Sequence, residues 1–80
     1  SLLEGARAEA VEVIVQEGAP VAGKPLKDAR LPRECLVCAY VRAGEAAIPN
    51  GDTALATGDR VILFVQTSFS QKVMAYFKAK

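Results

Sequence analysis

The sequence predicts an α+β fold in which a small β-rich pseudo-barrel, built as strand, loop, hairpin and strand, is capped by a C-terminal helix. Three observations support it: valines that alternate near the N-terminus, Gly-Asp turns between short apolar segments, and an apolar stripe at helical spacing near the C-terminus. Eighty residues are enough for one domain, but a core of this size is only marginally sufficient. We therefore expect the chain to gain stability by pairing with a second subunit.

Residues 10–17 form the first predicted strand, because valines alternate there with polar residues at a period of two. Ile14 breaks the alternation, which indicates that both faces of the strand are partly covered. A Gly-Ala-Pro sequence ends the strand, and residues 26–29 are long enough for one helical turn. Leu31-Pro32 ends that turn, since the residue before a proline is disfavoured in helical conformation.

Residues 35–42 and 46–48 are the strands of a predicted hairpin. Residues 49–52 follow as a reverse turn, with proline at the position of fixed φ and a positive φ expected at the Asn-Gly pair. A second Gly-Asp turn precedes residues 60–66, the most apolar strand of the chain. Because an aspartate after a turn glycine commonly bonds its own backbone, we assign structural turn roles to Gly51, Asp52, Gly58 and Asp59.

The C-terminal element is predicted to be a helix. Ser68 and Gln71 have the spacing of a capping box at its start. Phe69, Val73 and Phe77 recur at helical spacing together with Tyr76, and so predict one apolar stripe that packs on the sheet.

Catalysis is not expected, and no catalytic residue is assigned. The chain has no histidine for general acid–base work, no visible base to activate a serine, threonine or cysteine, and no phosphate-binding glycine motif. Cys35 and Cys38 form a C-x-x-C, but they lie in a predicted strand, where residues three apart point to opposite faces. No second such pair and no histidine completes a tetrahedral site, so no metal is expected.

The net charge of +1 comes without a basic run, which argues against binding to nucleic acid. No apolar run approaches the roughly 20 residues that a membrane-spanning helix needs. Lys24, Arg30, Arg33 and Arg42 flank the short helical turn and the second strand, and they could converge on an anionic small ligand such as a nucleotide. The alternative is that they are ordinary surface charges.

Several short motifs occur in a characteristic order along the chain. They are Gly23-Lys-Pro-Leu26, Leu31-Pro32, Val41-Arg42, Ile48-Pro49, Gly51-Asp-Thr53 and Gly58-Asp-Arg-Val-Ile-Leu-Phe64. In this order they resemble the TrkA-C domain, also called the RCK C-terminal domain, over residues 10–77. We accordingly expect residues 1–9 to be a linker from a missing upstream domain and residues 10–78 to be the TrkA-C domain.

The resemblance implies a regulatory, ligand-sensing lobe of a cytosolic regulator of Trk-type potassium uptake, at the inner face of the plasma membrane. Such lobes form homodimers, follow a Rossmann lobe in the parent chain, and couple dimer geometry to a membrane potassium channel subunit. Any NAD or ATP is expected only in the missing Rossmann lobe, so this fragment should carry no cofactor of its own.

A ligand groove is also implied by the resemblance, at Arg30, Leu31, Arg42, Ile48 and Pro49. Some family members bind cyclic di-AMP through an Ile-Arg pair after the short helix and an Ile/Val-x-Pro region after the hairpin. This chain has Leu31-Pro32 where that arginine would be, which argues against cyclic di-AMP. Ile48-Pro49 and Arg42 remain compatible with a groove.

Two other functions stay open at this point. Gly-Asp turns between short strands also occur in swapped-hairpin DNA-binding dimers, although the nearly neutral charge disfavours that class. The same domain family also serves as a cytosolic module of other cation or carboxylate transporters, and flanking sequence would be needed to distinguish that setting.

Overall fold

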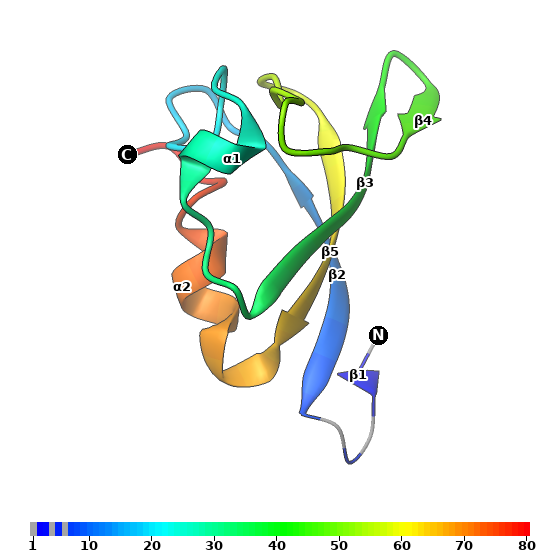
Figure 1. Ribbon diagram of the computed structural model, residues 1–80, viewed down its shortest axis with the longest axis vertical. Helices are drawn as coiled ribbons and strands as arrows, with labels where there is room; N and C mark the ends of the chain where they lie inside the picture. The colour runs from blue at the N-terminus through cyan, green and yellow to red at the C-terminus, as the bar shows by residue number, and fades with distance from the viewer. Residues whose placement is uncertain (1, 4, 6) are drawn as a thin grey trace.

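The computed structural model describes residues 2, 3, 5 and 7–80 and contains a single five-stranded antiparallel sheet with the order β1-β2-β5-β3-β4 (Figure 1). The predicted order of strand, loop, hairpin, strand and helix is confirmed, and both helices lie on the same side of the sheet. The elements are β1 (Leu2–Leu3), β2 (Ala8–Ile14), α1 (Leu26–Ala29), β3 (Cys35–Arg42), β4 (Glu45–Ala47), β5 (Arg60–Gln66), a 3₁₀ turn (Thr67–Phe69) and α2 (Ser70–Met74).

The most apolar strand, β5, occupies the centre of the sheet, where it pairs with β2 along one edge and β3 along the other. Val61, Leu63 and Val65 are buried on the face that carries the helices. The residues between them, including Ile62 and Phe64, point to the opposite face because side chains alternate along a strand. We call the first face the inner face and the second the outer face.

A β-bulge interrupts the register between β3 and β5, at Val37 and Ala39. Before the bulge, Val37 pairs with Leu63 on the inner face, and after it Tyr40 pairs with Val61 on that face. The extra residue, Cys38, therefore breaks the strict alternation of β3. The prediction that Cys35 and Cys38 point to opposite faces relied on that alternation, so it does not apply across the bulge.

The C-terminal segment covers the inner face as predicted. Val73 and Phe77 are fully buried, and Phe69 and Tyr76 pack against the same core. The predicted capping box is wrong, because α2 begins after Phe69 and has no side-chain cap. Residues 67–69 form a 3₁₀ turn instead, and the N–H of Ser70 bonds the carbonyl of Thr67, so the backbone replaces the Ser68 side chain.

Two turn predictions had different outcomes. Gly58 has a φ of +91°, in the left-handed region that favours glycine, but the positive φ expected at Gly51 is absent. At that turn the Asp52 N–H bonds the Asn50 side chain at 2.8 Å, so an Asx turn reverses the chain.

The hairpin forms through Ala43 and Gly44, both with positive φ, and β4 starts one residue earlier than expected.

Leu55 provides a test of the core, since it is fully buried although it lies in the loop between β4 and β5. We expect Leu55→Ala to lower the free energy of unfolding by about 2–5 kcal/mol, through lost burial and the cavity left behind. Ile48→Ala, in the same loop but 87% exposed, is the control and should change it by less than about 0.5 kcal/mol. Urea unfolding followed by circular dichroism measures both, and equal losses would contradict this description of the core.

Candidate functional site

The candidate site begins with the way the loop after β4 docks on the short helix. The N–H of Lys27 bonds the carbonyl of Gly51 at 2.9 Å, and the N–H of Leu26 bonds the carbonyl of Thr53 at 2.9 Å. These bonds satisfy backbone donors at the start of α1, which has no side-chain cap. The loop is therefore held against α1.

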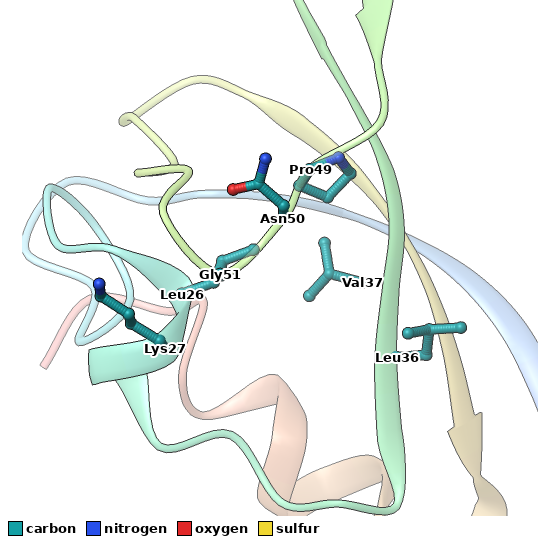
Figure 2. Close-up of a pocket in the computed structure, with 7 residues that line it drawn as sticks. All are labelled: Leu26, Lys27, Leu36, Val37, Pro49, Asn50 and Gly51. Atoms are coloured by element: carbon teal, nitrogen blue, oxygen red, sulfur yellow. The ribbon is translucent and has the colours of Figure 1, made fainter.

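An open groove of about 300 Å³ lies between this loop, α1 and β3 (Figure 2). Figure 2 shows Val37 pointing from β3 toward Pro49 and Gly51, whereas Leu36 points to the other side of the strand. The groove is lined by Leu26, Lys27, Leu36, Val37, Pro49, Asn50 and Gly51.

The groove combines an apolar wall with polar groups at its rim. The Lys27 ammonium group bonds Asp52 at 2.8 Å, but the two side chains are 60% and 82% exposed. An exposed ion pair of this kind contributes little, so an anionic ligand could compete for the lysine. The side-chain oxygen of Asn50 accepts the Asp52 N–H in the Asx turn, and the N–H₂ group of the same side chain points away from that bond. The rim can thus donate hydrogen bonds to an anionic or carbonyl-bearing ligand.

Arg42 and Asp59 form a second polar centre, away from the groove. The Arg42 Nε and Nη2 atoms bond the two Asp59 oxygens at 2.9 and 2.7 Å, and Nη2 also bonds the Ala54 carbonyl at 3.1 Å. The second Asp59 oxygen accepts the Ala56 N–H at 2.8 Å. The guanidinium carbon lies 5.1 Å from the centre of the Tyr40 ring. Asp59 is 2% exposed, so its charge is held by a bidentate partner and a backbone donor.

These contacts decide the charge state of the pair. The hydrogen bond from Arg42 holds the pKa of Asp59 below its ordinary value; burial acts in the opposite direction, and the Ala56 N–H adds to the lowering. Asp59 in turn raises the pKa of Arg42. The pair is therefore ionised at neutral pH, and the donors of Arg42 that face Asp59 are already engaged.

The structure does not gather the five residues predicted to bind ligand into one site. Only Pro49 lines the groove. Ile48 beside it is 87% exposed, Leu31 packs partly against the core, and the Arg30 carbonyl accepts the Tyr76 hydroxyl at 3.1 Å. Their role in binding stays a prediction.

Sequence reasoning missed the residues of α1 and β3 that line the groove. Leu26 and Val37 are assigned only to the short helical turn and to a hairpin strand, because nothing in their spacing shows that the loop after β4 approaches them. The Asn50-Gly51 pair was read for its turn chemistry alone. A signal did exist in the Lys27 and Asp52 charges, whose pairing joins α1 to the loop.

The two cysteines are free thiols. Burial, and to a lesser extent the neighbouring Cys38, raises the pKa of Cys35 to about 11. Cys35 is therefore a protonated thiol at neutral pH and a weak nucleophile. In the part of the chain that the structure describes, no three metal-ligating side chains come together.

The fold defines a class of protein, a small β-sheet domain capped by helices on one face. The family model described as "TrkA-C domain" matches residues 10–78. The chain therefore belongs to the TrkA-C domain family, and the resemblance found in the sequence is confirmed.

Similar proteins carry names from the Trk system. "Trk system potassium uptake protein TrkA homolog 1" of Methanosarcina mazei is 40% identical over 76 residues, which is 95% of this chain and 17% of the relative. "Trk system potassium uptake protein TrkA homolog" of Pyrococcus abyssi is 38% identical over 80 residues, 99% of this chain and 35% of the relative. The chain thus spans only a minor part of the relatives that it matches.

Solved structures show the same fold. One described as "Structure of RCK domain with cda" has a TM-score of 0.75 at 19% identity, covering 86% of this chain and 97% of that one. Another, "S. agalactiae BusR in complex with its busA-promotor DNA", has a TM-score of 0.69 at 18% identity, covering 96% and 40%. At these identities the likeness concerns the fold alone. None of the described helices is long and apolar enough to cross a bilayer.

The Arg42–Asp59 pair leads to a prediction about pH. Because the folded-state pKa of Asp59 is depressed, the stability it contributes is complete above its unfolded value of about 4 and is lost as pH falls through the folded value. We expect Asp59→Asn to lower the free energy of unfolding by about 1–3 kcal/mol at pH 7 and to flatten its decline on the acid side. Urea unfolding between pH 7 and pH 2.5 measures both effects.

The control for this prediction is Asp52→Asn, which removes a carboxylate from the exposed pair with Lys27. This variant should change the free energy of unfolding by less than about 1 kcal/mol at pH 7. Its free energy of unfolding should decline with falling pH as it does in the parent chain. A steep decline that persists in Asp59→Asn would show that other carboxylates dominate it.

Proposed function

We propose that this chain is the ligand-sensing and dimerisation lobe of a cytosolic regulator of potassium transport. In this proposal an upstream Rossmann lobe of the parent chain carries NAD or ATP, and the full-length assembly contacts a membrane potassium channel subunit. The lobe itself performs no catalysis and binds no nucleic acid. Membership of the TrkA-C family and the Trk names of the relatives support the setting.

The groove beside Pro49 is the single observation that carries the sensing role. Its volume of about 300 Å³ is at the lower end of the range for ligand pockets, roughly 300–1,000 Å³. It could hold the base or the phosphate of a nucleotide, with the ring against Val37 and Pro49 and the anionic part at Lys27. A second copy of the chain would double these contacts, so a dimer suits a larger ligand.

The proposed mechanism is allosteric. Ligand bound in the groove favours one relative position of the two lobes, because it makes different contacts in each position. A coupling free energy of about 1–3 kcal/mol is enough to change the balance of two states by 5- to 150-fold. The attached Rossmann lobes would pass this change in position to the channel.

A nucleotide titration tests the sensing role. Isothermal titration with AMP, ATP, NAD and cyclic di-AMP, each alone, should identify at least one that binds the isolated chain. Lys27→Gln should weaken that binding at least about tenfold, since it removes a charge-assisted hydrogen bond worth about 1.5–3 kcal/mol. Lys78→Gln, at the exposed C-terminal end, is the matched control and should leave the affinity unchanged.

Two results would contradict the sensing role. One is the absence of binding by all four nucleotides at millimolar concentration. The other is binding that Lys27→Gln and Lys78→Gln leave equally strong, because the ligand would then lie elsewhere on the chain.

A further inference from the structure

Two segments that are far apart in the sequence lie side by side near the C-terminus: the loop that follows β2 and the residues after α2 (Figure 1). The N–H of Gln16 bonds the carbonyl of Phe77 at 2.9 Å, and the N–H of Val21 bonds the carbonyl of Tyr76 at 3.0 Å. The Gln16 side-chain oxygen also accepts the N–H of Ala79 at 2.8 Å. The surface that these two segments share is therefore held in one shape.

An open hollow of about 230 Å³ lies where the two segments meet, and it is lined by Pro20, Ala75 and Tyr76. A proline ring, a methyl group and an aromatic ring make its walls apolar. The Tyr76 hydroxyl donates to the carbonyl of Arg30 at 3.1 Å, which fixes the position of the aromatic ring. Pockets for drug-sized ligands measure roughly 300–1,000 Å³, so this smaller hollow suits a single aliphatic side chain.

The segments that form the hollow are rich in positive charge. Residues 15–24 and 67–80 together carry four lysines and one acidic residue, Glu17, and Arg30 adds a positive charge next to Tyr76. The rest of the chain has eight acidic residues against five basic ones. The net charge of +1 therefore conceals a separation of charge between this surface and the rest of the chain, and a surface of one sign attracts partners of the other.

These positive charges are available to a partner. The four lysines and Arg30 are all exposed, and the ion pairs found in the described part of the chain involve other residues. Lys72 comes one helical turn before Ala75 and Tyr76, so it lies on the side of α2 that faces the hollow. Lys78 follows Tyr76 by two residues. We call the hollow and the cations beside it the C-terminal surface: Pro20, Arg30, Lys72, Ala75, Tyr76 and Lys78.

We propose that the C-terminal surface binds an acidic segment of another protein, which inserts one aliphatic side chain into the hollow. Carboxylates on either side of that side chain pair with Lys72, Lys78 and Arg30. Because main-chain bonds hold the walls of the hollow in place before binding, little conformational entropy is lost on this side of the interface. The C-terminal surface shares no residue with the groove beside Pro49, so this inference does not depend on the sensing role.

An anionic bilayer fits this surface less well than a peptide does. Helices that lie on membranes insert large apolar side chains between their lysines. The large hydrophobic residues that are exposed in the described part of the chain all lie elsewhere, on the sheet and on the loop after β4: Ile14, Leu36, Ile48 and Phe64. The C-terminal surface is hollow where a membrane-binding surface would project, so it suits a partner that supplies the projecting side chain.

Fluorescence anisotropy tests the surface with a labelled peptide that has one central leucine and four glutamates on each side of it. We expect this peptide to bind, and the same peptide with a central alanine to bind at least about fivefold more weakly, because less apolar surface is buried. Lys72→Gln and Lys78→Gln should each weaken binding about two- to fivefold, as the loss of an exposed ion pair does. Lys27→Gln removes the same charge at the groove and is the matched control, which should leave the affinity unchanged.

A variant that fills the hollow supplies a second test, which alters no charge. Ala75→Leu puts a larger side chain into the hollow and keeps a residue that favours helix. The leucine and alanine peptides should then bind this variant equally. Ala79→Leu adds the same bulk at an exposed position outside the hollow, and it should preserve the preference for leucine. Circular dichroism establishes that each variant is folded.

Three results would overturn this inference. The first is no binding of either peptide at millimolar concentration, and the second is equal binding of the two peptides by the unaltered chain. The third is co-sedimentation with vesicles of phosphatidylcholine and phosphatidylglycerol in the absence of peptide binding, because the surface would then belong to a bilayer.

Failure of this inference and failure of the sensing role can be told apart, because two variants exchange parts between the experiments. Lys27→Gln should weaken the nucleotide and leave the peptide unaffected, whereas Lys78→Gln should weaken the peptide and leave the nucleotide unaffected. Peptide binding that Lys72→Gln and Lys78→Gln both leave unchanged would place the peptide elsewhere on the chain and overturn the C-terminal surface alone.

Discussion

The bidentate pair between Arg42 and Asp59 fixes the end of the sheet from which the groove loop departs. Arg42 is the last residue of β3 and Asp59 immediately precedes β5, so the pair joins two strands that are adjacent in the sheet. The same two side chains bond the backbone of Ala54 and Ala56, and the Asp59 carbonyl accepts the N–H of Val15. The ion pair thus connects β3, β5 and the loop that buries Leu55, and the Asp59 backbone adds a contact to the residue after β2.

This constraint explains how so short a chain can hold an irregular loop against its core. A buried carboxylate is costly unless it is paired, and here both of its oxygens have donors. With the base of the loop secured, residues 49–53 can reach across to α1 and close the far side of the groove. The pair therefore acts on the candidate site by positioning its wall, although neither side chain lines the groove.

Much of the fold could be predicted from the sequence, because its signals are local. Alternating valines and the apolar run of β5 specify strands, and the stripe that includes Val73 and Phe77 specifies the packing of the C-terminal segment. The β-bulge at Cys38 depends on the pairing of β3 with β5, and the bond from the Ser70 N–H to the Thr67 carbonyl is a local main-chain bond, so no residue pattern signals either of them. The chain's family was predictable for a different reason, since its weak motifs recur in a fixed order.

The candidate site was much less predictable than the fold. Arg42 looked like a free donor because its partner, Asp59, is 17 residues away and was read as a turn residue. The groove itself is a product of two long-range backbone contacts, between α1 and the loop, that involve main-chain atoms only. Main-chain hydrogen bonds do not depend on side-chain identity, so the sequence signals this contact only through the opposite charges of Lys27 and Asp52.

The same property of the groove bears on how the family could diversify. Because main-chain bonds from Leu26 and Lys27 hold the loop against α1, the exposed side chain of Lys27 is not needed to position the loop. Substitutions at Lys27 could then change which molecule is recognised without moving the loop, whereas the Asn50 side chain is needed for the Asx turn. If the groove binds ligand as proposed, its preference could therefore change through Lys27 without a loss of folding.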